Sequence, residues 1–102
     1  MTTLHIVNKS PFEKNAMESC LGHALDGDAI LLFEDGVYGA LSNTRIANEI
    51  SRRAGAVKFF VLGPDLNARG LGDGRIADGI TVVDYSGFVD LVTTHGRTQS
   101  WL

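Results

Sequence analysis

The sequence predicts an α/β protein with a mostly parallel sheet of four to five strands and helices on both faces. Apolar runs of strand length alternate along the chain with longer segments of helical periodicity, as in proteins built from βαβ units. The run "DAILLF" is continuous and does not alternate, which is typical of a strand covered on both faces. A chain of 102 residues without linkers or repeats is expected to form one domain, residues 1–102.

The first half of the chain predicts two strands and two helices. Residues 4–7 form a short apolar strand, and residues 28–33 form a longer one. Ser10, Pro11 and Glu13 together predict a helix start, because they match a capping box with proline at the first helical position. We expect this helix to reach about Leu25 and to stop at Gly27. A second helix is expected over residues 44–54.

The second half continues the alternation. Residues 57–62 predict the third strand, residues 64–70 at most a short helix, and residues 70–80 a glycine-rich loop. The fourth strand is expected at residues 81–85, and Ser86 is expected to cap a helix over residues 87–95. The tail "TQSWL" is either disordered or a short last strand. The side chains that we expect to face inward from the last helix are Phe88, Val89, Leu91 and Val92.

Composition argues against several classes of function. The net charge of −3 without a basic run does not favour direct nucleic-acid binding, and the longest apolar run is far too short to cross a membrane. With no signal peptide and one cysteine, we expect a cytoplasmic protein with a reduced thiol. The three histidines, His5, His23 and His95, have no metal-ligand spacing. The glycines of "GLGDGR" do not match a dinucleotide-binding loop, so no metal or cofactor is expected.

Cys20 is the candidate reactive residue. On a helical wheel Phe12, Ala16, Cys20 and Ala24 follow one apolar ridge, and a free cysteine on such a ridge is commonly a small buried hydrophobe. His23 lies three residues on and could stabilise a thiolate. Cys20 is mid-helix, however, and no third group orients the histidine. The residues favour a structural cysteine over a reactive one, and both readings stay open.

Two further features lie after the second strand. Glu34 and Asp35 are adjacent, and in an extended segment they would point to opposite sides, which does not favour an acid–base pair. Val37 and Tyr38 are apolar residues in an expected loop. Together with Trp101, they are predicted to be exposed and to contribute to contacts with another subunit.

The whole pattern resembles the DsrH/TusB family of sulfur-relay proteins. The resemblance rests on "LHIVNKSPF", "GDAILLFEDGVYGAL", "VLGPDLNARGL", "VDYSGFVDLV" and the terminal "QSW", in this order. It implies a DsrE-like fold and a heterohexamer with two copies each of this chain and of two homologous subunits, DsrE and DsrF or TusD and TusC. Such a complex passes persulfide sulfur to a DsrC-like or TusE-like acceptor.

The resemblance also implies a modest role for Cys20. The principal sulfur-accepting cysteine of these complexes belongs to the DsrE or TusD subunit, whereas Cys20 matches a cysteine of DsrH-type members. The first reading is therefore a DsrH-type subunit of a DsrEFH complex in the oxidation of stored sulfur. In this reading the chain is an accessory subunit, mainly architectural, with Cys20 as a candidate secondary persulfide carrier. The alternatives are a TusB-type subunit for 2-thiolation of the tRNA wobble uridine, or a flavodoxin-like module for a small ligand.

Overall fold

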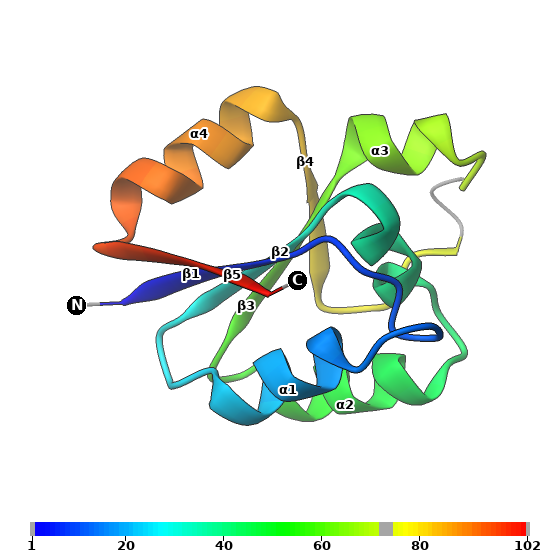
Figure 1. Ribbon diagram of the computed structural model, residues 1–102, viewed down its shortest axis with the longest axis horizontal. Coiled ribbons are helices and arrows are strands. Elements are labelled where there is room, and N and C mark those ends of the chain that lie inside the picture. The colour runs from blue at the N-terminus through cyan, green and yellow to red at the C-terminus, as the bar shows by residue number, and fades with distance from the viewer. Residues whose placement is uncertain (1, 72–74, 102) are drawn as a thin grey trace.

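A parallel sheet forms the centre of the protein (Figure 1). The computed structural model describes residues 2–71 and 75–101, and within these ranges five strands pair in the order β4-β3-β2-β1-β5. All four neighbouring pairs are parallel, which confirms the predicted sheet. The strands are β1 (Thr3–Val7), β2 (Ala29–Leu32), β3 (Lys58–Leu62), β4 (Ile80–Val83) and β5 (Arg97–Trp101).

The last strand lies at one edge of the sheet, beside the first. β5 pairs with β1 in a register that places Arg97 opposite Thr3 and Trp101 opposite Val7. The chain therefore crosses from β4 at one edge to β5 at the other, and α4 (Tyr85–Thr94) makes this crossing. The terminal segment is thus a strand, the second of the two options that its sequence left open.

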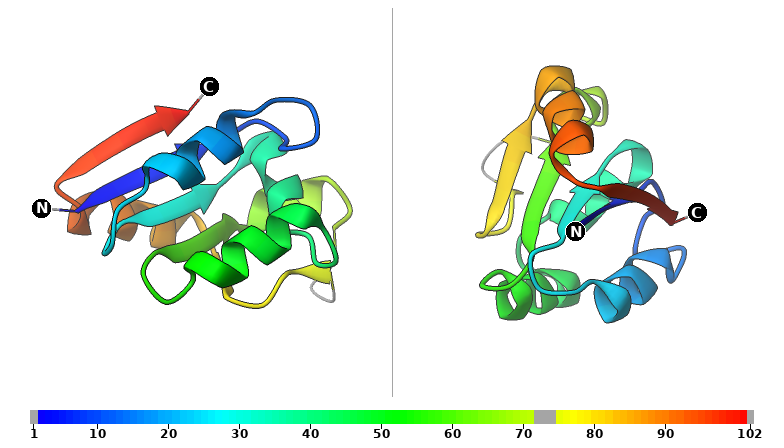
Figure 2. Two further views of the ribbon diagram at one scale, coloured as in Figure 1. Left: turned by 90° about the horizontal axis from the view of Figure 1, so that it is seen from below. Right: turned by 90° about the vertical axis from the view of Figure 1, so that its left-hand side faces the viewer.

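Helices lie on both sides of the sheet, as predicted. α1 (Ala16–His23) and α2 (Arg45–Arg53) lie on one side, and α3 (Gly63–Ala68) and α4 lie on the other (Figures 1 and 2). α2 begins as its sequence predicts, because the Thr44 side chain accepts a hydrogen bond from the Ala47 N–H at 3.0 Å. The main core fills the space beneath α1 and α2, and a smaller core of Leu4, Ala29 and Leu31 lies toward α4.

The predicted start and end of the first helix are wrong. Ser10 does cap a turn, since its Oγ accepts from the Phe12 N–H at 3.2 Å and its carbonyl accepts from the Lys14 N–H at 3.0 Å. This turn ends, however, and α1 begins only at Ala16. At its other end the backbone is extended at Ala24, so α1 stops before Leu25. Ser10 therefore stabilises a separate turn that precedes the helix.

The predicted orientation of the last helix is wrong in two of its four inward residues. Asp84 caps α4 through a 2.9 Å hydrogen bond from the Gly87 N–H, so the helix begins before Ser86. Phe88 and Leu91 pack toward the sheet, as predicted. Each of the two valines follows one of these residues and is therefore rotated about 100° around the helix. Val89 is 61% exposed and Val92 is 41% exposed.

A 3-10 helix replaces the loop expected after β2. This helix, η1 (Glu34–Ala40), buries Val37 completely in the main core. The expectation that Val37 is exposed for subunit contacts is therefore wrong, because the tight 3-10 turn directs this side chain inward. Tyr38 is half-buried and packs against the same core. Of the expected glycine-rich loop, residues 72–74 lie outside the described part of the chain.

Candidate functional site

Cys20 lies inside the main core, where the wheel places it. Its side chain is fully buried, and Ala16 and Ala24 of the same ridge are buried with it. Burial is the main cause that raises the pKa of the Cys20 thiol to about 12, and the negative charge of Asp28 raises it further. The Arg53 guanidinium opposes this rise only in part. At neutral pH the thiol is therefore protonated, and this form is a poor nucleophile.

Phe12 of the predicted ridge and His23, the predicted partner of the thiol, lie outside the core that contains Cys20. Phe12 is 59% exposed because it belongs to the turn before α1. His23 is exposed at the end of α1, where its Nδ1 donates to the Ser19 carbonyl at 2.8 Å. Its ring packs at 5.3 Å, centroid to centroid, from the ring of Trp101. Within the described residues His23 forms no hydrogen bond with Cys20, so it does not supply the thiolate partner that the spacing allows.

A buried polar network near Cys20 is the feature that the sequence reasoning missed. Asp28 precedes β2 and accepts a hydrogen bond from His5 Nε2 at 2.9 Å. The indole Nε1–H of Trp101 donates to the other ring nitrogen, His5 Nδ1, at 3.0 Å. His5 and Asp28 are each 5% exposed. A signal for this network exists, because β1 alternation places His5 on the same face as the core residue Val7. A polar side chain there requires buried partners.

Asp28 is held in its charged form. Burial alone would raise the pKa of this carboxyl, but hydrogen bonds from the backbone N–H groups of Leu25 and Thr3 and from His5 outweigh it. The net effect is a pKa below the usual range of aspartate. The three donors lie 2.9–3.0 Å from the carboxylate oxygens. Asp28 therefore ties the starts of β1 and β2 to the segment that follows α1.

The network forms the floor of a hollow on the α1 side of the sheet. The hollow measures about 310 Å³ and opens at the edge formed by β5. Its lining combines aromatic, cationic and carboxylate groups that come from both ends of the chain. The lining residues are Thr3, His5, His23, Leu25, Asp28, Arg97, Gln99 and Trp101.

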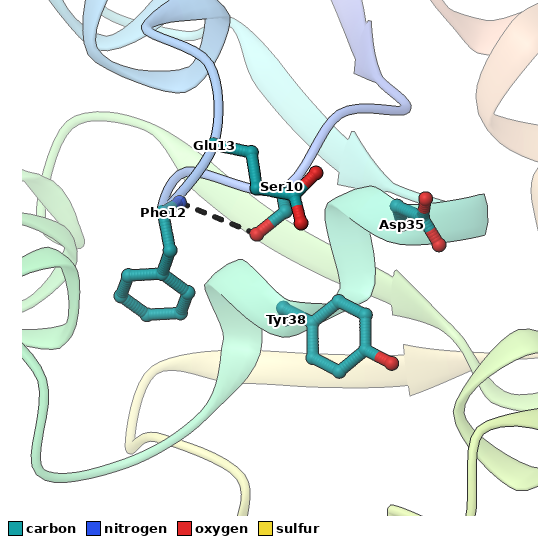
Figure 3. A pocket seen from close by; sticks show the side chains of 5 residues that line it. All are labelled: Ser10, Phe12, Glu13, Asp35 and Tyr38. Atoms are coloured by element: carbon teal, nitrogen blue, oxygen red, sulfur yellow. Dashed lines mark hydrogen bonds between the residues drawn. The ribbon is translucent and has the colours of Figure 1, made fainter.

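A second hollow, of about 350 Å³, lies at the carboxyl ends of β1 and β2 (Figure 3). Ligands gather at this edge in many parallel α/β sheets. Asp35 and Tyr38 extend from η1 on one side, and Ser10, Phe12 and Glu13 come from the turn before α1. The two carboxylates of this hollow are those of Asp35 and Glu13. Asp35 forms an ion pair with Arg69 at 3.0 Å, which balances its charge. Glu34 instead donates its backbone N–H to Asp65, and it forms no acid–base pair with Asp35.

In residues 2–71 and 75–101, no group of three histidine, cysteine, aspartate or glutamate side chains is placed to hold a metal ion. No helix in this part of the chain is long and apolar enough to cross a bilayer.

Comparison with known proteins places the chain among proteins of similar length. Residues 9–98 match the family described as "DsrH like protein". Protein TusB of Pectobacterium parmentieri is 34% identical, and Protein TusB of Enterobacter sp. (strain 638) is 39% identical. Both alignments cover 96% of this chain and 99% of the relative.

Solved structures show the same fold at low sequence identity. The ychN protein from E. coli superposes with a TM-score of 0.79 at 13% identity, and the alignment covers 98% of this chain and 99% of that one. Protein MTH1491 from Methanobacterium thermoautotrophicum gives a TM-score of 0.72 at 16% identity, covering 97% and 96%. These two similarities concern the fold alone.

Proposed function

Because the chain belongs to the DsrH/TusB family of sulfur-relay proteins, we propose that it is a TusB-type subunit of a cytoplasmic relay complex. The proposed complex contains TusC-like and TusD-like subunits and delivers persulfide sulfur to a TusE-like acceptor for 2-thiolation of tRNA. The observation that carries this choice is the alignment of TusB proteins with nearly the whole chain. These relatives favour the TusB reading over the DsrEFH reading that the sequence alone placed first.

We propose a mainly architectural role within that complex. The one cysteine of the chain is buried, and its pKa is raised to about 12, so its resting state offers no thiolate for sulfur transfer. A sulfur relay requires an accessible thiolate on each carrier. A neighbouring subunit is therefore proposed to carry the principal thiol, with this chain shaping and stabilising the assembly.

The outer face of α4 supports assembly with a homologous subunit. Tyr85, Val89 and Val92 are exposed along one stripe of this helix. Asp90 is the one charged side chain within α4. Exposed apolar patches of this kind mark protein interfaces. We call these three residues the α4 patch and propose that a homologous subunit of the relay packs on it.

Co-expression with TusC-like and TusD-like chains from the same genome tests the proposed assembly. We expect the three chains to copurify, and native mass spectrometry to show two copies of each. Loading the assembly with a sulfane donor should add sulfur to the TusD-like chain. A monodisperse monomer that recruits neither chain would contradict the proposed role.

Val89→Lys is expected to disrupt this assembly. A charge placed in the middle of the α4 patch would be buried without a partner, so copurification should fall at least about tenfold. Thr94→Lys is the matched control, because Thr94 is also exposed on α4 but lies outside the patch. Both isolated variants should unfold at the same denaturant concentration as the wild type. Equal copurification of the two variants would show that the α4 patch is not the contact.

Cys20 supplies a second candidate function, that of a secondary persulfide carrier in a DsrEFH complex. A cysteine at this position is the feature that favours the DsrH reading. Intact-mass analysis of each subunit after incubation with a sulfane donor separates the two functions. Added sulfur on this chain, lost in Cys20→Ala, would support the carrier. Added sulfur confined to another subunit would leave Cys20 a packing residue.

Alkylation of Cys20 is expected to be slow in the folded protein. Because the side chain is buried and its pKa is about 12, iodoacetamide should label it about 10³-fold more slowly than in urea. The rate should keep rising with pH beyond the ordinary thiol range near ~8.5. Mass spectrometry of quenched time points measures both effects. A plateau near pH ~8.5 would show an accessible thiol with an ordinary pKa.

A further inference from the structure

The C-terminal strand is paired with the sheet along one side only. β5 lies at the sheet edge, and its four residues before Trp101 are all exposed. It is held by its backbone pairing with β1 and by Trp101, which packs against the main core. The hydrogen bond from Trp101 Nε1 to His5 Nδ1 is the one side-chain hydrogen bond between β5 and the rest of the described chain. The state of His5 therefore matters for β5.

Hydrogen bonding fixes the tautomer of His5. An indole N–H is only a donor, so His5 Nδ1 must accept and cannot carry a proton. Asp28 is charged and only accepts, so His5 Nε2 must carry the proton that it donates. The ring is therefore the neutral Nε2–H form. Both ring nitrogens are occupied, which leaves no position for a second proton without loss of a bond.

We propose that His5 is a proton-operated latch on β5. When a proton from solvent binds the Nδ1 lone pair, the new N–H faces the indole N–H of Trp101, and the hydrogen bond between them is lost. The imidazolium keeps its bond to Asp28, where opposite charges now attract. Trp101 then donates its N–H to water. β5 is then held only by its backbone pairing with β1 and by the packing of Trp101 against the main core. Mild acid would thus loosen the C-terminal strand while the rest of the sheet stays folded.

Other titratable and charged groups surround this latch and must be separated from it. His23 on α1 packs against the same indole ring, and Arg97 on β5 lines the same hollow. Cys20, on the buried face of α1, is protonated at neutral pH. Arg53 on α2 donates to the carbonyls of Leu21 and Ala24 at the end of α1. Of these, only His23 is a second histidine beside Trp101, so it is the group that could imitate the latch.

NMR of the full chain tests the proposal directly, because the protein has one tryptophan and hence one indole N–H signal. At about pH 8, long-range ¹H–¹⁵N spectra should show His5 as the neutral Nε2–H tautomer. As the pH is lowered from about 8 to about 5, the indole signal should shift with a single proton. Amide exchange in β5 should become about fivefold faster relative to β2, the change expected for loss of one neutral hydrogen bond.

Two glutamine variants separate the two histidines. His5→Gln can donate to Asp28 and accept from Trp101 but cannot titrate, so the indole shift and the change in β5 exchange should both disappear. His23→Gln should keep both. Trp101→Phe should give fast β5 exchange already at about pH 8. The proposal is overturned if His5→Gln keeps the transition, if His23→Gln abolishes it, or if wild-type β5 exchange does not change relative to β2.

Discussion

Gly36→Ala is expected to destabilise the protein strongly. A Cβ atom at this position would lie 2.1 Å from the carbonyl oxygen of Val7 and 2.9 Å from its carbonyl carbon. Both atoms belong to the backbone of β1, so no side-chain rotation relieves the overlap. The same carbonyl accepts a hydrogen bond from the Phe33 N–H at 3.1 Å, which fixes its position. Separation of η1 from β1 should cost at least about 3 kcal/mol, the upper part of the range for overpacked cores.

Gly39→Ala is the matched control for this prediction. Gly39 lies in the same 3-10 helix and is also buried, but its added Cβ would meet only side-chain atoms at 3.5 Å or more. We expect this variant to unfold within about 1 kcal/mol of the wild type, because a smaller unfolded-state entropy offsets any slight crowding. Urea titration followed by circular dichroism measures both variants. Comparable stability of the two would show that η1 can shift away from β1 at little cost.

The strands were predictable because their signal is local and continuous. An uninterrupted apolar run such as residues 29–33 is typical of a strand that is buried on both faces, and β2 lies within that run. Helix boundaries depend on which of several capping groups is used. Ser10 and Asp84 both cap backbone N–H groups, yet only Asp84 begins a helix there. The sequence alone therefore predicted a wrong start for the first helix. For the last helix it predicted two inward residues, Val89 and Val92, that are exposed.

The candidate site could be predicted only in its local part. The ridge through Ala16, Cys20 and Ala24 is a property of one helix, so the burial of Cys20 follows from spacing. The partners of His5 come from a turn 23 residues away and from a strand 96 residues away. No periodicity links residues at such separations. What the sequence does contain is the anomaly itself, a histidine between two apolar residues of a buried strand.

The choice between the two branches of the family shows the same limit. One residue, Cys20, favoured the DsrH reading, whereas similarity along nearly the whole chain favours the TusB reading. A buried thiol can be kept for packing alone, since free cysteine behaves as a small hydrophobe. Its presence is therefore weaker evidence for a function than an alignment that spans 96% of the chain.

Asp28→Asn is expected to lower the free energy of unfolding at neutral pH by about 3 kcal/mol. The carboxylate accepts hydrogen bonds from Thr3, Leu25 and His5, and each such bond to a charged acceptor contributes ~1.5–3 kcal/mol. An asparagine keeps one oxygen acceptor but turns its NH₂ toward at least one of these buried donors. The unpaired donors should destabilise the starts of β1 and β2 together. Urea titration at neutral pH measures the loss.

The pH dependence of this difference identifies the carboxylate as its cause. Because the folded pKa of Asp28 lies below its unfolded value of about 3.9, the stabilisation is complete above that value. It is lost as the pH falls through the folded pKa. The gap between wild type and Asp28→Asn should therefore narrow in acid below about pH 4. Asp26→Asn, an exposed change two residues away, should stay within about 0.5 kcal/mol of the wild type throughout. A gap that does not narrow below about pH 4 would mean that the carboxylate does not hold this junction in its charged form.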